Sequence, residues 1–203
     1  MIAIIDFGCG NTNAFINAFK RLNIPASIAK SVSDIENAKK IVLPGVGSFD
    51  YVINNFNKSG FRDMVEKKVL DEKIDIIGVC AGMQIFAERS DEGKEKGLGW
   101  IEGEIRLLNT KKIIHKTKLP HMGWNTIHPK KNPLFRELNK KSRFYFVHSY
   151  YFENHNPGHT ISTTDYAGLF TSAVNLKNVY GVQFHPEKSH QNGLQLLKNF
   201  ATL

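Results

Sequence analysis

Cys80 stands at a position where α/β proteins often present a nucleophile. It directly follows an apolar run, residues 75–79, and precedes the small residues Ala81 and Gly82. Small residues permit a sharp turn from a strand into a helix, and the amino terminus of that helix favours thiolate over thiol. Taken alone, a cysteine at a strand end is more often a small buried apolar residue. Cys80 therefore indicates catalysis only together with a base.

A base and an acid stand close together near the end of the chain. His185 and Glu187 flank Pro186 at the end of another apolar run, residues 179–184. A neutral imidazole can take a thiol proton, and a carboxylate on its other nitrogen fixes the tautomer and stabilises the imidazolium. Without Cys80, a satisfied buried histidine and a solvated acid would be the simpler interpretation. With Cys80, the three residues predict a catalytic triad.

A glycine-containing loop, residues 44–47, supplies a third component. Acyl transfer needs N–H donors aimed at a developing oxyanion, and glycines leave backbone N–H groups accessible. The predicted oxyanion hole combines the backbone of Val46 and Gly47 with the N–H of Ala81. The loop is not a phosphate-binding P-loop, because no Gly-Lys-Ser/Thr follows it, and residues 8–13 lack the third glycine of a dinucleotide-binding fingerprint.

Strands that alternate with helices are predicted for the first half of the chain. The predicted strands cover residues 2–5, 26–29, 40–43 and 75–79. A helix is predicted from the apolar spacing of residues 14–22, and helices are predicted to fill residues 49–70. Ser33 and Glu36 are interpreted as the capping box of a further short helix. Strands that are apolar throughout are typical of a parallel sheet covered on both faces. Functional sites of such sheets collect at the carboxyl ends of the strands, where Cys80 and His185 are expected.

The second half of the chain has a different pattern. Strands joined by turns are predicted at residues 102–108, 143–147, 159–163, 169–174 and 179–184, and a final helix at 191–200. The predicted fold class is therefore α/β, with an open, mostly parallel twisted sheet flanked by helices and with mixed or antiparallel strands in the second half.

The composition fits one globular domain. With 203 residues, of which 41% are hydrophobic and 23% charged, the chain can bury one sizeable core, and we expect a single domain over residues 1–203. The longest apolar run, residues 76–83, is far too short for a transmembrane helix, which argues against a membrane protein. The first residues lack a secretory signal, which favours the cytoplasm. Cys9 and Cys80 are then expected as free thiols.

The charge of the chain limits its possible partners. The formal net charge of +8 comes largely from scattered lysine pairs rather than from one basic face. No nucleic-acid-binding motif accompanies this charge, so we expect no nucleic acid partner. The anionic partners that remain possible are an acidic protein surface and a phosphorylated substrate. A turn separates His155 from His159, and no third ligand stands nearby, so no metal site is predicted.

Residues 78–84 around Cys80 and residues 183–187 around His185 resemble the motifs of the class I, triad-type glutamine amidotransferases. The resemblance implies a flavodoxin-like fold and hydrolysis of L-glutamine to L-glutamate and ammonia without a cofactor. It implies that Cys80 is the nucleophile, that His185 acts as base and acid, and that Glu187 orients His185. By position it also implies a glutamine pocket lined by Gly47, Gln84, Glu92, His148, Ser149 and Tyr150.

Within that family the chain resembles the glutaminase subunits of imidazole glycerol phosphate synthases, on residues 43–49, 120–125, 144–150 and 180–189. This resemblance implies a heterodimer with a (β/α)8-barrel cyclase that receives the ammonia and makes imidazole glycerol phosphate and aminoimidazole carboxamide ribonucleotide in histidine biosynthesis. It also implies low glutaminase activity without that partner. The positions that would meet the partner are Asn11, Met122, Trp124, Asn125, Tyr145 and Lys188.

Some residues instead resemble paralogous amidotransferase subunits that supply a different synthetase in surface-sugar biosynthesis. They are Ala81, which stands where leucine is usual, and residues 6–11 and 97–100. This alternative leaves the glutaminase chemistry unchanged but alters the acceptor of the ammonia. A partner-independent thiol hydrolase would not explain Gln84 or the segment around Trp124. A catalytically dead regulator would not explain the presence of all three triad residues.

Overall fold

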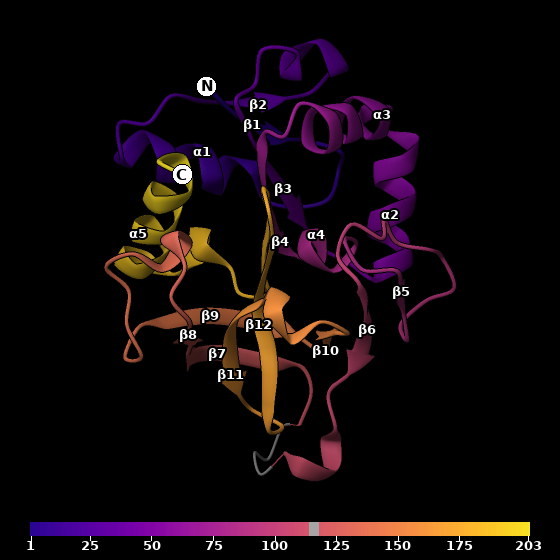
Figure 1. Cartoon of the computed structure of the whole chain (residues 1–203), viewed down its shortest axis with the longest axis vertical. Coiled ribbons are helices and arrows are strands. Elements are labelled where there is room, and N and C mark those ends of the chain that lie inside the picture. The colour runs from indigo at the N-terminus through magenta and orange to yellow at the C-terminus, as the bar shows by residue number, and fades with distance from the viewer. Residues whose placement is uncertain (114–117) are drawn as a thin grey trace.

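The computed structural model describes residues 1–113 and 118–203, which form a large twisted sheet with helices on both sides (Figure 1). Five neighbouring strands of this sheet are parallel, in the order β2-β1-β3-β4-β13. Their bounds are Ile2–Ile5 for β1, Ala26–Ala29 for β2, Lys40–Gly45 for β3, Asp75–Cys80 for β4 and Val179–Val182 for β13. The predicted parallel sheet is confirmed.

The same sheet continues with mostly antiparallel pairs. Beyond β13 the order is β12-β10-β6-β5, and β11 and β8 branch from β12; β7 and β9 form a separate antiparallel ribbon. The bounds are Arg89–Ser90 for β5, Gly103–Leu107 for β6, His121–Thr126 for β7, His128–Pro129 for β8, Arg143–His148 for β9, Tyr150–Asn154 for β10, Thr160–Asp165 for β11 and Leu169–Leu176 for β12. The mixed second half is likewise confirmed.

Alternation of apolar side chains along the parallel strands divides the core into two clusters. Ala3 and Ile5 of β1 pack with residues of α2 (Phe49–Lys58) and α3 (Phe61–Glu66), whereas Ile2 and Ile4 pack with residues of α1 (Thr12–Arg21) and α5 (His190–Ala201). Figure 1 shows these two helix pairs on opposite sides of β3 and β4. Both faces of the parallel strands are therefore covered, as their continuous apolar sequences require.

Several boundaries differ from the sequence prediction. The helices expected over residues 49–70 are present as α2 and α3, and their boundary, which the sequence did not place, lies at Gly60 with its left-handed φ of 78°. The expected capping box of Ser33 and Glu36 is wrong: it is Asp34 whose carboxylate accepts the backbone N–H of Ser31, at 2.8 Å. No helix in the described part of the chain combines the length and apolar character needed to cross a membrane.

Candidate active site

Cys80 is the last residue of β4 and lies on a strained turn into the single helical turn α4 (Ala81–Gln84). Its φ of 55° and ψ of −118° lie in a region that side chains other than glycine rarely adopt. The turn needs Gly82, because an added Cβ there would lie 2.1 Å from the carbonyl oxygen of Leu43. The predicted sharp turn is present, but α4 has four residues, so its dipole is too short to be the main support of a thiolate.

His185 and Glu187 lie in a buried pair beside this turn. His185 Nδ1 donates to Glu187 Oε1 at 2.8 Å, and each side chain is 3% exposed. The backbone N–H of His185 donates to the carbonyl of Tyr145 on β9, and Ser189 Oγ donates to the carbonyl of His185 at 2.6 Å. These bonds explain why β13 ends at Val182 rather than at the expected 184: the chain there crosses from the sheet to the β7–β9 ribbon.

The charge state of His185 follows from its two neighbours. Burial by itself would lower its pKa, but the interactions with Cys80 and with the Glu187 carboxylate outweigh burial and raise the pKa to about 10. His185 Nε2 is buried and makes no hydrogen bond to any other residue that the structure describes. This nitrogen therefore remains available to the sulfur of Cys80 and to a substrate.

Cys80 and His185 line the same pocket, whose volume is about 230 Å³. The pocket is smaller than the roughly 300–1,000 Å³ typical of sites for drug-sized ligands, which suits a single small metabolite. Its lining includes Cys80 and His185 of the predicted triad, whereas Glu187, which is bonded to His185, is not part of it. The lining also includes the predicted oxyanion-hole and glutamine-binding positions: Val46, Gly47, Ala81, Gln84, Glu92, His148, Ser149 and Tyr150. A larger hollow of about 770 Å³, lined by residues from 129 to 140, holds none of them.

Gln183 is a site residue that the sequence reasoning missed. Its Nε2 donates to Cys80 Sγ at 3.7 Å, and its Oε1 accepts a hydrogen bond from Gln84 Nε2 at 3.0 Å. Gln84 Nε2 also donates to the carbonyl of Tyr150 at 3.1 Å. The side chain of Gln84 is thereby fixed in the wall of the pocket. The signal that could have revealed Gln183 was its place two residues before His185.

His148 is held neutral in the same wall. Its Nδ1 donates to the carbonyl of Tyr150 at 2.8 Å, so its Nε2 accepts from Nδ1 of His121 at 2.9 Å. Burial, and next the charge of His121, lower the pKa of His148 to about 3. Its neighbour His121 was not predicted as a site residue, because only the β7–β9 pairing places it opposite His148.

Glu92 contributes an acidic group to the pocket. Its Oε2 accepts the backbone N–H of Phe49, at the start of α2, at 2.8 Å. The pKa of this carboxyl group is raised. Burial and the nearby charge of Asp50 raise it, and they outweigh the hydrogen bond from Phe49, which lowers it. A partly buried carboxylate in a small pocket favours a ligand with an ammonium group.

Most of the predicted partner positions gather beside the pocket. Trp124 and Tyr145 are cross-strand partners on β7 and β9 with ring centroids 6.2 Å apart, and Lys188 Nζ lies 5.8 Å from the Tyr145 ring. Met122 is 61% exposed and Trp124 39%, which is unusual for large apolar side chains. Asn125 instead hydrogen-bonds the carbonyl of Asp165, and Asn11 accepts from Ala14 N as the cap of α1.

The fold and this pocket have the features of the class I glutamine amidotransferases, and the chain belongs to that family: the family model described as glutamine amidotransferase class-I matches residues 3–203. Over 100% of both chains it is 47% identical to the imidazole glycerol phosphate synthase subunit HisH of Leptospira borgpetersenii and 45% identical to that of Bdellovibrio bacteriovorus. A crystal structure of a glutamine amidotransferase shares the fold, with a TM-score of 0.76 at 19% identity over 100% of this chain and 99% of that one. The chain is a glutaminase subunit of an amidotransferase.

Proposed function

We propose that this chain, as a single domain over residues 1–203, hydrolyses L-glutamine through a thioester on Cys80. The observation that carries the proposal is the buried His185–Glu187 pair, whose second imidazole nitrogen is available in the pocket that also contains Cys80. A carboxylate on one imidazole nitrogen and a thiol near the other is the arrangement that activates a cysteine.

In this mechanism the Cys80 thiolate attacks the carboxamide carbon of glutamine, and the carbonyl oxygen becomes an oxyanion. The backbone N–H groups of Val46 or Gly47 and of Ala81 stabilise that oxyanion. Protonated His185 gives its proton to the amide nitrogen, the C–N bond breaks, and ammonia leaves. Water, deprotonated by His185, then attacks the thioester, the C–S bond breaks, and glutamate and the Cys80 thiolate are released.

We further propose that the ammonia passes to a (β/α)8-barrel cyclase in the cytoplasm, which uses it in histidine biosynthesis. Relatives of the same length are named subunits of imidazole glycerol phosphate synthase, which supports such a partner. The proposed docking face comprises Met122, Trp124, Tyr145 and Lys188, and Asn11 and Asn125 extend it. Its exposed aromatic and apolar side chains are of the kind that anchor protein interfaces.

The proposal is tested by trapping Cys80 with the diazoketone analogue of glutamine. We expect stable addition of the analogue to the peptide that contains Cys80, slowed by excess glutamine and abolished in Cys80→Ala. Cys9 is the matched control, because it is the other buried thiol, and Cys9→Ala should be labelled as the wild type is. Addition that survives Cys80→Ala would contradict the assigned nucleophile.

A further inference from the structure

Glu92 reaches the glutamine pocket from a loop, residues 91–96, that contains no helix or strand. The loop begins at the end of β5, where the backbone N–H of Asp91 donates to the carbonyl of Ile105 at 2.8 Å, and Ser90 Oγ accepts the N–H of Glu92 at 3.0 Å. A loop without its own ladder of hydrogen bonds depends on side chains from neighbouring elements for its position. The position of the Glu92 carboxylate depends in turn on those side chains.

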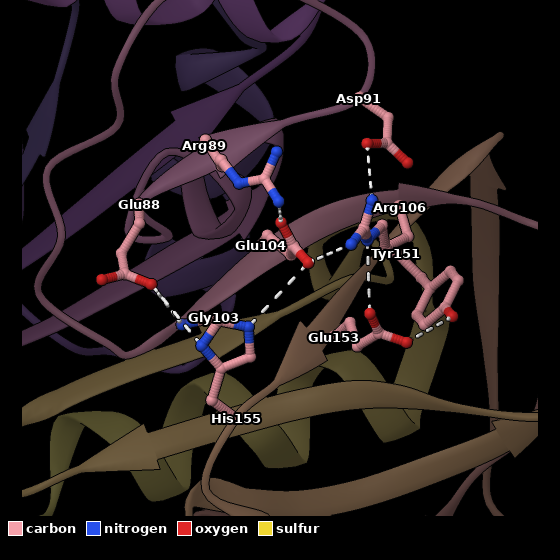
Figure 2. A network of polar contacts seen from close by, with 9 residues as sticks. All are labelled: Glu88, Arg89, Asp91, Gly103, Glu104, Arg106, Tyr151, Glu153 and His155. Atoms are coloured by element: carbon pink, nitrogen blue, oxygen red, sulfur yellow. Dashed lines mark hydrogen bonds and ion pairs between the residues drawn. The ribbon is translucent and has the colours of Figure 1, made fainter.

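Arg106 of β6 links this loop to the sheet. Its Nη1 lies 3.0 Å from Asp91 Oδ1, its Nε lies 3.3 Å from Glu153 Oε2 on β10, and its Nη2 pairs with Glu104 on its own strand. Figure 2 shows the guanidinium between these carboxylates. A planar guanidinium can hold several carboxylates in fixed directions, which a lysine ammonium cannot do. Arg106 thereby connects the first residue of the loop to two strands.

Arg89 provides a natural comparison in the same network. It pairs with Glu104, whose side chain is 8% exposed, while Arg89 itself is 64% exposed. His155 faces the same carboxylate at 3.9 Å and Glu88 at 3.6 Å. In Figure 2 the dashed line from the guanidinium of Arg89 leads to Glu104, and none leads to Asp91. Both arginines therefore pair with Glu104, but Arg106 also pairs with the loop.

The far end of the loop has a second anchor. Asp50 of α2 accepts the backbone N–H groups of Lys94, at 2.9 and 3.1 Å, and of Glu95, at 3.0 Å. This approach requires glycine at position 93, because a Cβ there would lie 1.9 Å from Asp50 Oδ1. Glu92 thus lies between an anchor at Asp91 and an anchor at residues 94–95.

We propose that Arg106 is a positioning residue for glutamine binding, which it serves by fixing Asp91 and so the adjacent Glu92 carboxylate toward the α-ammonium group of the substrate. This inference rests on the proposed function. Without the Arg106–Asp91 pair the loop occupies its binding-competent position for a smaller fraction of time. The apparent affinity for glutamine falls in proportion to that fraction. Because neither Cys80 nor His185 contacts the network, the chemical step is unchanged.

The test compares Arg106→Gln with Arg89→Gln in steady-state glutaminase assays. We expect the KM for glutamine to rise about 5- to 20-fold in Arg106→Gln, with kcat within about twofold of the wild type, because a lost positioning contact acts on ground-state and transition-state binding alike. Arg89→Gln should keep the wild-type KM. The KM of Arg106→Lys should lie between those of the wild type and of Arg106→Gln. Gly93→Ala, which disturbs the other anchor, should also raise KM.

A second measurement separates this inference from the proposed function. In the Cys80→Ala background glutamine is bound without turnover, and its dissociation constant can be measured by thermal shift. The same 5- to 20-fold loss in Arg106→Gln is expected there, together with unchanged labelling of Cys80 by iodoacetamide in the chain that keeps the thiol. A wild-type KM and dissociation constant in Arg106→Gln, or equal losses in Arg89→Gln, would overturn the inference. Absence of turnover by the wild type in the presence of the loaded barrel subunit would contradict the proposed function instead.

Discussion

His185 owes its charge to Glu187 and Cys80, and this dependence makes the triad testable one residue at a time. Glu187→Gln removes the carboxylate but keeps the size of the side chain. We expect kcat to fall about 10²- to 10⁴-fold, because the imidazolium loses its counter-charge and the imidazole its fixed tautomer. Glutamate release at saturating glutamine measures the effect. A loss under threefold would contradict an orienting role for Glu187.

The same pair sets the alkaline limit of activity. The pKa of His185 is raised from 6.5 to about 10, so its protonated form stabilises the folded state fully below pH 6.5, and that contribution is lost as the pH rises toward 10. We expect activity to decline near pH 10, since protonated His185 is the acid for ammonia release. In Glu187→Gln the decline should move to lower pH. A pH–rate profile of the wild type and of Glu187→Gln measures this shift. Identical alkaline limbs in the two profiles would contradict the assignment of His185 as the acid whose pKa Glu187 raises.

His148 predicts a loss of stability in acid. Its pKa is lowered from 6.5 to about 3, so the unfolded chain takes up a proton in this range that the folded chain does not. Stability is therefore complete above pH 6.5 and is lost as the pH falls toward 3, by up to about 1.4 kcal/mol per pH unit. Urea unfolding of His148→Gln should show a shallower acid slope than the wild type. Equal slopes would show that His148 is not held neutral.

At the residue scale, the sequence predicts the groups that react better than the groups that support them. Cys80, His185 and Glu187 follow predicted strands and carry obvious chemistry; the structure places Cys80 and His185 in one pocket and bonds Glu187 to His185. Gln183 and His121 act by hydrogen bonds whose partners come from other strands. Pairing of that kind is a product of tertiary structure, and local sequence carries little signal of it.

At the element scale, the turn after β4 depends on the close approach of β3 and α4. Gly82→Ala would place a methyl group 2.1 Å from the carbonyl oxygen of Leu43. We expect a loss of unfolding free energy of about 1–3 kcal/mol and a loss of activity, because the strand end and the Cys80 turn must move apart. Gly158→Ala, in an exposed turn, is the control. Wild-type stability of Gly82→Ala in urea would contradict this account.

The parallel strands are the elements that the sequence predicts most closely, because each is a short run bounded by turn residues: β1 and β2 have the predicted bounds, and β3 and β4 extend beyond theirs. Strands β7 and β10 were not predicted. Their side chains alternate between exposed and buried only weakly, and their register comes from pairing with β9, β6 and β12. The pattern of residues 49–70 predicts helices but does not place the boundary between them at Gly60, which depends on one left-handed residue.

At the scale of the whole molecule, the docking face predicts how a barrel partner would bind. Trp124 stacks on His190 at 5.0 Å and remains 39% exposed. Trp124→Ala should weaken partner binding by at least about tenfold, since exposed tryptophans are frequent anchors of interfaces. Labelling of Cys80 by the glutamine analogue in the absence of the partner should be the same in Trp124→Ala as in the wild type. Titration with the barrel subunit by calorimetry measures the affinity, and wild-type affinity would place the interface elsewhere.

Glutamate release is the direct measure of glutamine hydrolysis at Cys80 for a barrel partner. The purified chain is assayed alone and with the barrel subunit and its phosphoribosyl ligand, beside Cys80→Ala and Cys9→Ala. We predict low release by the chain alone, strong stimulation by the loaded barrel, loss of both in Cys80→Ala and retention in Cys9→Ala. Cys80-dependent release that the barrel does not raise would assign the ammonia to a different synthetase. No glutamate under any condition would contradict the claim.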